Sequence, residues 1–377
     1  KKILGLLIAV LSYYSCVATP TLIQGIYYNL NTSDKTATVT YKTLYNESYY
    51  PMEMDYTKFI IIPSKVKHDN IEYTVTAIGD SAFYRNWEIT NISIPGSVTS
   101  IGKYAFYGCS VIERIILPNN ITEIKEGAFS GCNFLEEIHL PKNLNRIENK
   151  TFEGCYKLEN ITLPQELTTI GDSAFLGCYA LKKITIPKNV TKIGKFAFFQ
   201  CRELKQVINE SALKIKAKEE NNGYVAYNTI GVEDRDGGKF KVTDDYLFFS
   251  NNTDTWLVTY YGNEPYIELP LDHEEESYNI APSAFRNNSN LIRIKLSPKT
   301  KQIGEYAFAA CKFLEEIVLP DSLNEIAPYT FCDCYRLSQI TMPKQLGKIG
   351  KNSFENTKIR NIKFPPSLSA IDSFAFY

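Results

Sequence analysis

The hydrophobic positions of this chain recur with a period of 23 residues. The recurring isoleucines are Ile78, Ile101, Ile124, Ile147, Ile170 and Ile193, then Ile280, Ile303, Ile326, Ile349 and, one residue early, Ile371. A phenylalanine follows each of them five residues later, at Phe83, Phe106, Phe129, Phe152, Phe175, Phe198, Phe285, Phe308, Phe331, Phe354 and Phe376. Because self-similarity at a fixed period marks a chain of stacked structural units, we predict a solenoid.

Each repeating unit contains one short strand that is followed by a proline. In the unit that begins at Ile170, apolar residues at Leu181, Ile184 and Ile186 end in the alternation of a strand with one buried face. Pro187 ends this strand, because proline cannot donate a hydrogen bond to the next strand. One unit has too few apolar residues to bury its own face, so neighbouring units must close the core together. The sequence therefore predicts a mainly β fold.

The phenylalanines and certain glycines occupy fixed places in the unit. We expect the Phe rings to stack as a buried spine, which adds aromatic contacts to simple area burial. Glycine directly follows the recurring isoleucine at Gly102, Gly171, Gly194, Gly304 and Gly350. This position indicates a backbone that needs either a positive φ or a close approach to another segment.

Seven of the nine cysteines lie three residues after the recurring phenylalanine, at Cys109, Cys132, Cys155, Cys178, Cys201, Cys311 and Cys334. Asn86 and Asn288 hold that place in the first unit of each block. This exchange indicates an inward side chain that fills a small space or bonds a loop carbonyl, and we expect buried free thiols. A disulfide through Cys332 is the alternative. The even spacing gives a line of thiols and no tetrahedral cluster, so we expect no metal site.

The start of the chain has the pattern of an export signal. Lys1 and Lys2 precede the apolar run 3–11, which is too short to cross a membrane, so we predict a signal peptide over 1–18 and no transmembrane segment. Cleavage after Ala18 would release the protein, whereas Cys16 could carry a lipid anchor. Both alternatives place the mature chain outside the cell, secreted or at the surface.

The remaining chain divides into four segments. We predict a β-rich cap over 19–75, with a hairpin from Gly25 to Tyr41 and strands at Phe59–Ile62 and Ile71–Val75. The first block of repeats covers 76–204, and the second covers 280–377 and stops inside a unit, so we expect further sequence to follow. Between them, 205–279 reads as an insert of enlarged coils with a hairpin from Tyr246 to Tyr260, and a hinge between separate domains is the alternative.

The composition narrows the function. The 41 basic and 42 acidic side chains are evenly mixed, which argues against nucleic acid as the partner, because such binding needs clustered cations. The three histidines, His68, His139 and His273, are far apart in sequence. Glycine-rich phosphate loops, nucleophile elbows and zinc-protease motifs do not occur. We therefore expect a protein that is not an enzyme, with no catalytic residue and no cofactor.

Laid out as Ile-Gly-x-x-Ala-Phe-x-x-Cys-x-x-Leu-x-x-Ile-x-Leu-Pro, the unit resembles the BspA-like leucine-rich repeat proteins. The segments 77–83 and 94–102 match that pattern closely, and the resemblance extends from about Ile71 to the end, interrupted by the insert. It implies a right-handed solenoid of the leucine-rich-repeat type. It also implies a secreted or surface protein with a role in adhesion to host matrix proteins or other cells.

We expect a protein partner to bind the outward positions of the strands. These positions are Arg114 and Ile116, Glu137 and His139, Asn160 and Thr162, Lys183 and Thr185, Arg293 and Lys295, Glu316 and Val318, and Gln339 and Thr341. A solvated sheet face without a ligand is the plain alternative. A second alternative is a glycan-binding or scaffold site on exposed aromatic residues of the insert, namely Trp256, Tyr260 and Tyr261.

Overall fold

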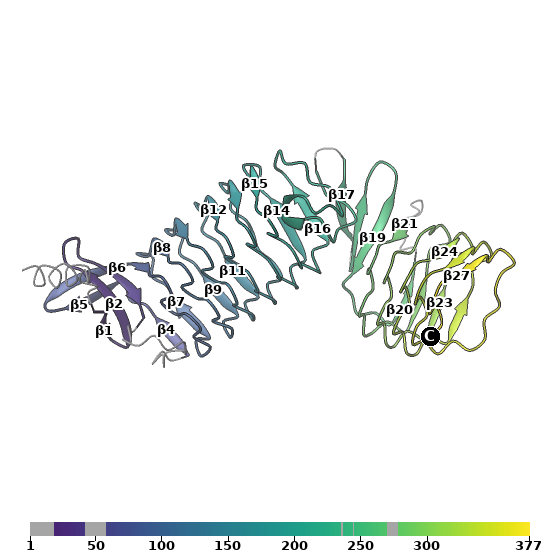
Figure 1. Ribbon diagram of the computed structural model, residues 1–377, viewed down its shortest axis with the longest axis horizontal. Helices are drawn as coiled ribbons and strands as arrows, with labels where there is room; N and C mark the ends of the chain where they lie inside the picture. Colours follow the sequence, from purple (N-terminus) through teal and green to yellow (C-terminus); the bar gives the residue numbers. More distant parts are fainter. Residues whose placement is uncertain (1–18, 42–57, 235–236, 244, 270–277) are drawn as a thin grey trace, which may run out of the picture. The chain divides into compact units, whose positions relative to one another are not determined.

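The computed structural model of the chain describes residues 19–41, 58–234, 237–243, 245–269 and 278–377 (Figure 1). The signal expected over 1–18, with Cys16, lies outside the described residues. The chain forms two compact units, Lys1–Asn228 and Thr229–Tyr377, which are called unit 1 and unit 2 below. A unit without a number is one repeat of the chain. Within the described ranges, the one helical element is the short 3-10 helix η1 (Asn222–Tyr224), and all other regular elements are strands.

Unit 1 begins with a hairpin that runs directly into the repeats. The first sheet consists of β1 (Thr21–Ile23), β2 (Ile26–Asn31), β3 (Thr36–Thr40), β6 (Ile71–Ile78), β8 (Ser100–Ile101) and β10 (Glu123–Ile124), with β5 (Lys65–His68) paired to β6. The predicted hairpin is confirmed, because β2 and β3 pair antiparallel on either side of the turn at 32–35. β3, β6, β8 and β10 pair in parallel and β5 pairs antiparallel with β6, so the hairpin strands continue the sheet that carries the repeated isoleucines.

The row of repeated isoleucines continues through unit 1, and a second row consists of the strands of the proline positions. The repeated isoleucines continue through β12 (Arg146–Ile147), β13 (Thr169–Ile170) and β15 (Lys192–Ile193), which pair in parallel. The strands that precede the prolines are β4 (Phe59–Ile61), β7 (Asn91–Ser93), β9 (Arg114–Ile116), β11 (Glu137–His139) and β14 (Lys183–Ile186), and β16 (Gln206–Asn209) continues the row without a proline after it. The parallel pairing of β9 with β11 and of β14 with β16 shows that each repeat stacks on the next, as the period predicted (Figure 1). β4 pairs with β7 in the same way, although their paired residues are 32 positions apart.

Unit 2 has the same construction behind a three-stranded meander. The meander is β17 (Lys239–Thr243), β18 (Tyr246–Ser250) and β19 (Thr255–Tyr260), and β19 pairs in parallel with β21 (Tyr278–Ile280). The strands before the prolines are β20 (Tyr266–Glu268), β22 (Arg293–Lys295), β23 (Glu316–Val318) and β25 (Gln339–Thr341). The repeated isoleucines lie in β24 (Glu325–Ile326), β26 (Lys348–Ile349) and β27 (Ala370–Ile371). The hairpin predicted between Tyr246 and Tyr260 is confirmed as β18 and β19.

The phenylalanines form the stacked spine that the repeat predicted, buried from Phe83 to Phe354, whereas the last ring, Phe376, is 41 % exposed. In unit 1, from Phe83 to Phe198, successive ring centroids lie 5.0 to 5.7 Å apart with nearly parallel planes. In unit 2, from Phe285 to Phe376, the same distances are 5.0 to 5.5 Å. Phe152 and its neighbours in the stack are fully buried. Within unit 1 and within unit 2, the rings therefore join each repeat to the next along the core.

The aligned cysteines are free and buried, as expected. The Cys109 Sγ donates to the backbone oxygen of Phe83 at 3.0 Å, and each later cysteine of the row donates to the phenylalanine carbonyl of the preceding unit. In the first units, Asn86 and Asn288 instead accept hydrogen bonds from backbone N–H groups of their own loops. Cys332 is half-buried and free, so the disulfide interpretation is wrong in this structure.

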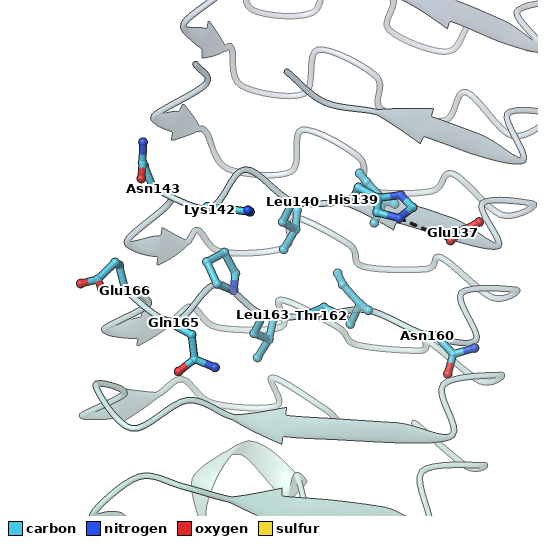
Figure 2. A pocket seen from close by; sticks show the side chains of 13 residues that line it. Glu137, His139, Leu140, Lys142, Asn143, Asn160, Thr162, Leu163, Gln165 and Glu166 are labelled. Atoms are coloured by element: carbon cyan, nitrogen blue, oxygen red, sulfur yellow. Dashed lines mark ion pairs between the residues drawn. The ribbon is translucent and has the colours of Figure 1, made fainter. Parts of the chain in front are cut away.

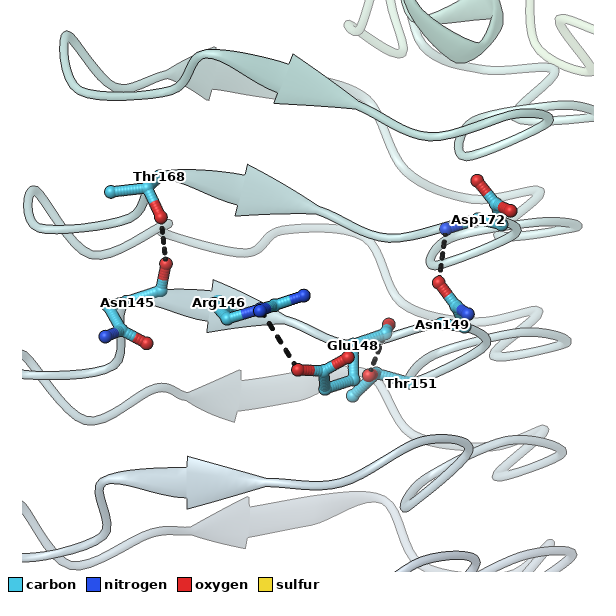
Figure 3. Close-up of polar contacts among 7 residues, drawn as sticks. All are labelled: Asn145, Arg146, Glu148, Asn149, Thr151, Thr168 and Asp172. Atoms are coloured by element: carbon cyan, nitrogen blue, oxygen red, sulfur yellow. Dashed lines mark hydrogen bonds and ion pairs between the residues drawn. The ribbon is translucent and has the colours of Figure 1, made fainter.

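Close approach, and not positive φ, explains the glycines that follow the isoleucines. At Gly171 a Cβ would lie 2.6 Å from the backbone nitrogen of Asn149, and Gly102 and Gly194 meet Asp80 and Asp172 in the same way. The Asn149 side chain folds over this point and accepts a hydrogen bond from the Asp172 N–H at 2.8 Å (Figure 3). The side chain that covers the corner of one unit thus excludes a side chain from the next.

Candidate functional site

The strands that precede the prolines give unit 1 a continuous outward surface, called here the unit 1 face. Inward positions such as Ile115 and Ile138 are buried, so the residues on either side of them point to solvent. The first outward row is Phe59, Asn91, Arg114, Glu137, Asn160, Lys183 and Gln206. The second outward row is Ile61, Ser93, Ile116, His139, Thr162, Thr185 and Ile208.

The structure places the predicted residues of unit 1 on this one face. Arg114, His139, Asn160, Thr162 and Lys183 are exposed. Glu137 and Thr185 are half-buried. Parallel pairing in register brings Glu137 beside Arg114, and single bridges place Asn160 beside Glu137 and Lys183 beside Asn160. These seven side chains therefore form one surface within unit 1.

Charges on the unit 1 face are only loosely paired. Glu137 lies 3.9 Å from the Arg114 Nε and 3.6 Å from the His139 Nε2. Among the residues that the structure describes, no carboxylate lies within ion-pair distance of Lys183, whereas the adjacent Lys182 bonds Glu159 at 2.8 Å. Exposed pairs of this kind contribute little to stability. The charged groups of the face therefore remain available to a partner.

A groove of about 640 Å³ lies on the unit 1 face, at β11 and the segment around Asn160. Glu137 and His139 line it from β11, and Asn160 and Thr162 line it from the next unit (Figure 2). Beyond the strands it continues between Lys142, Asn143, Gln165 and Glu166. The segment at Asn160 makes isolated bridges in place of a regular strand, which opens the surface between β11 and β14. The lining offers hydrogen-bond donors and acceptors together with side chains of positive and of negative charge.

Sequence reasoning placed Ile116 on this face but missed the rest of its apolar end, which lies on β4. Phe59 and Ile61 on β4 are 68 % and 75 % exposed, and Ile116 on β9 is 75 % exposed. The strand at Phe59–Ile62 was expected in the cap, but its continuation of the repeat surface was not recognised. The signal was present at Ile62-Pro63, which has the same strand-then-proline pattern as Ile94-Pro95. Exposed large apolar groups gathered on one face are typical of interaction sites.

The equivalent positions of unit 2 are paired more closely with each other. Arg293 lies 3.1 Å from Glu316 on the next strand, and Lys295 bonds Glu268 on the preceding one. The Lys295 ammonium lowers the pKa of the Glu268 carboxyl from its usual value. Gln339 and Thr341 are exposed, and Val318 is half-buried. Opposite charges on adjacent strands stabilise the sheet locally, so this face resembles a solvated surface more than the unit 1 face does.

The alternative aromatic site in the insert is not one exposed cluster. Tyr261 is 47 % exposed and Trp256 is half-buried, but Tyr260 is buried at 7 % exposure. The expectation of an exposed Tyr260 is wrong, because its ring packs against Phe285 at 5.5 Å and occupies the phenylalanine place of its coil. Its hydroxyl accepts a hydrogen bond from the Glu264 N–H at 2.9 Å. Tyr260 therefore belongs to the core of unit 2.

The described residues contain no group of three or more His, Cys, Asp or Glu side chains arranged to hold a metal ion. Burial raises the pKa of the Cys109 thiol to about 12, so it is neutral at physiological pH. The search for long apolar helices, limited to the same residues, found none that could cross a membrane.

Comparison with known proteins agrees with this construction. The model of the BspA-type leucine-rich repeat region matches residues 76–205 and 265–377 in six copies. The chain belongs to the BspA-type leucine-rich repeat family. The two matched ranges are the ranges in which the 23-residue period occurs, together with the coil of β20.

Several solved structures of leucine-rich repeat proteins are similar to this family member. A leucine-rich cell surface protein of Faecalibacterium prausnitzii is 24 % identical, with 95 % of this chain and 92 % of that chain covered and a TM-score of 0.45. The pneumococcal vaccine antigen PcpA is also 24 % identical, with 95 % and 89 % covered and a TM-score of 0.42. A leucine-rich repeat protein of T. pallidum is 20 % identical, with 78 % and 90 % covered and a TM-score of 0.33. None of the curated proteins compared with the chain matches it.

Proposed function

We propose that this BspA-type protein is a non-enzymatic binding protein of the cell surface or the extracellular space, and that the unit 1 face contacts its protein partner. The observation that carries the proposal is the combination of exposed Phe59, Ile61 and Ile116 with loosely paired charges on one face. Protein interfaces combine apolar anchors with a polar rim in this way. Host extracellular matrix proteins are the first partners to test.

The unit 1 face is preferred over the unit 2 face for a specific reason. A partner that binds unit 2 at Arg293 must compete with the ion pair to Glu316 at 3.1 Å, whereas Lys183 brings a cation with no competing carboxylate among the described residues. Removing an existing pair from water or from its partner costs free energy that the new contact must recover. The unit 1 face therefore offers more net binding energy per charged group.

Export supports the same proposal from the sequence. The charged and apolar start of the chain has the pattern of a signal peptide, with release after residue 18 or a lipid anchor at Cys16 as alternatives. Fractionation of cells that express the full chain, followed by mass spectrometry of the mature N-terminus, tests this point. Recovery of the uncleaved chain in the cytoplasm would contradict the proposed location.

The binding proposal is tested by capture from immobilised matrix proteins followed by titration. The double variant E137K/K183E reverses both charges and keeps the net charge unchanged. We expect binding on the order of tenfold weaker, since interfacial charges contribute up to a few kcal/mol, with an unchanged melting temperature because these positions lie outside the core. The matched control is E123K/K192E, which makes the same changes on β10 and β15, two strands of the row that carries the repeated isoleucines.

Two outcomes would contradict the proposed face. Equal affinity of E137K/K183E and its control would show that the partner binds elsewhere. Loss of binding in Tyr261→Ala alone, together with glycan capture, would favour the aromatic insert and the glycan-binding alternative.

A further inference from the structure

The unit 1 face has an arrangement of charges that is complementary to itself. Along the first outward row the order is Arg114, Glu137, Asn160, Lys183 and Gln206, and consecutive members are neighbours in register or by single bridges. Asn160 lies at the centre of this series. The acid lies one unit before it and the base one unit after it.

A two-fold axis parallel to the strands and directly above Asn160 would place a second copy of the chain face to face with the first. Such an axis reverses the order of the units but leaves the position along each strand unchanged, so each outward row faces its own counterpart. Glu137 then faces Lys183 of the second copy, and Lys183 faces the second copy's Glu137. One symmetry operation thus makes two opposite-charge contacts.

Axis placements half a repeat or one repeat away from Asn160 lose this match. An axis above Glu137 or above Lys183 brings that charge against itself. An axis between Glu137 and Asn160 brings Arg114 against Lys183 of the second copy. An axis between Asn160 and Lys183 places Glu137 against the neutral Gln206. Among these placements, the one above Asn160 pairs acid with base. An axis between Arg114 and Glu137 also sets acid against base. These two side chains already lie 3.9 Å apart within one chain, however, and this placement leaves Lys183 opposite the apolar Phe59.

The second outward row fits the same placement. Ile116 faces Ile208 of the second copy at both ends of the contact, and Thr162 faces its own counterpart at the centre. Ile116 is 75 % exposed in the single chain, so this pairing removes apolar surface from water. His139, which extends beside Glu137 at 3.6 Å, faces the small Thr185. Apolar contacts therefore lie at the two ends, with polar contacts between them.

We propose that a second copy of this chain binds the unit 1 face, in an antiparallel, two-fold symmetric pairing centred on Asn160. This inference rests on the proposed function, since it names the partner of the same face. Five repeats at about 4.8 Å per strand extend for roughly 20 Å, and strands of 3 residues are about 10 Å long. The resulting contact area of about 200 Å² is small against the ~800 Å² per partner of a stable interface. The pairing is therefore transient between isolated chains and strengthens when many copies face each other on opposed surfaces.

Charge reversal tests this pairing in a way that a foreign partner cannot reproduce. In each of the single variants E137K and K183E, both opposite-charge contacts become like-charge contacts. We expect self-association to be at least tenfold weaker. In E137K/K183E the lysine at 137 again faces a glutamate at 183, so association should return to within about threefold of the original chain. Sedimentation velocity of the full chain from micromolar to about millimolar concentration measures each association constant. E123K/K192E is the control and should behave as the original chain.

An additional variant probes the placement of the axis. Lys142 and Lys188 follow the prolines of the units before and after Asn160, so the pairing sets them opposite each other across the two copies. K142E should therefore strengthen association severalfold, and the gain should shrink in high salt, because these exposed charges are screened. A weaker association in K142E would contradict the axis above Asn160.

The results separate this inference from the proposed function. A chain that stays monomeric at all concentrations, or a double variant that associates no better than the single ones, overturns the pairing. The proposed function survives that result if matrix-protein binding is lost in E137K/K183E. Conversely, restored self-association in the double variant with no effect on capture by matrix proteins supports the pairing and removes the foreign partner from this face.

Discussion

A single inward position accepts cysteine or asparagine because the two residues meet different backbone groups. The Cys178 Sγ donates to the Phe152 carbonyl of the preceding unit at 3.2 Å, which requires a neutral thiol. Burial raises the pKa of this thiol well above its usual value and keeps it protonated. Phe83 and Phe285 are the first of the recurring phenylalanines in their blocks, so no recurring phenylalanine precedes them. There, Asn86 and Asn288 satisfy the loop N–H groups.

The thiols should consequently be almost unreactive in the folded protein. Burial, together with Asp333 and Glu355, raises the pKa of the half-buried Cys332 to about 12. The thiolate fraction at pH 8 is then lower than that of an ordinary cysteine by about three orders of magnitude. Alkylation of Cys332 by iodoacetamide, followed by peptide mass spectrometry, should be slow at pH 8, rise through pH 10, and be rapid in denaturant. Fast labelling of the native protein at pH 8 would contradict this environment.

Removal of one ring from the Phe spine should be costly. Phe152 is fully buried and stacks on Phe129 and Phe175 at 5.7 and 5.3 Å. We expect Phe152→Ala to lower the free energy of unfolding by about 3 to 5 kcal/mol, from lost burial and the cavity left behind. Phe134→Ala, at a surface ring that is 47 % exposed, is the control and should cost far less. In urea titrations, a loss below about 1 kcal/mol for Phe152→Ala would show that the ring is not part of the core.

At the scale of the repeating unit, one corner explains which units carry glycine after the isoleucine. Gly102, Gly171 and Gly194 each follow a unit with Asp or Asn two residues after its isoleucine, and Gly304 and Gly350 follow units with proline there. These residues cover the corner so closely that a Cβ in the next unit would overlap them. Units that follow Lys103 or Glu126 carry Lys125 and Glu148 in place of glycine. The repeat therefore varies in linked pairs.

This relation predicts the effect of adding one methyl group. Gly171→Ala would place a Cβ 2.6 Å from the Asn149 backbone nitrogen, which cannot move without shifting the unit. We expect a loss of about 1 to 3 kcal/mol, the usual cost of overpacking. Gly96→Ala is the matched control, because its Cβ would have nothing within 4 Å, and it should be neutral or slightly stabilising. Equal stability of the two variants would contradict the close approach.

Structural features that recur with the 23-residue period could be predicted from the sequence. Features that depart from the period, such as β4 and Tyr260, could not. Translation of one unit onto the next fixed the Phe spine, the cysteine row and the outward strand positions. The outward surface of β4 was missed because 32 residues separate Ile60 from its paired neighbour Ile92, so the period gave no sign of their contact. Tyr260 was expected to be exposed because 25 residues separate it from Phe285, so the 23-residue period does not reveal its place beside that ring.

At the scale of the whole molecule, the absence of a 3.6-residue stripe in the repeats corresponds to a chain of stacked strands and turns. Each unit offers its partner units two short parallel contacts and one ring stack, so cohesion is spread along the core and no single element dominates it. The regular backbone hydrogen bonds of the repeats therefore join residues that are 23 positions apart in sequence, as Ile170 and Ile193 are.

The far-ultraviolet circular dichroism spectrum should reflect this construction directly. Within the described residues the only helical element is η1, with 3 residues, whereas strands and turns recur in every unit. We expect a spectrum dominated by β structure, with a helical content well below the third that is usual for globular proteins. Heating should remove this signal together with the stacked rings' near-ultraviolet signal, since the strands and the Phe spine are parts of the same units. A helical content of a third or more in the folded protein would be incompatible with the solenoid and with every contact described for the two faces.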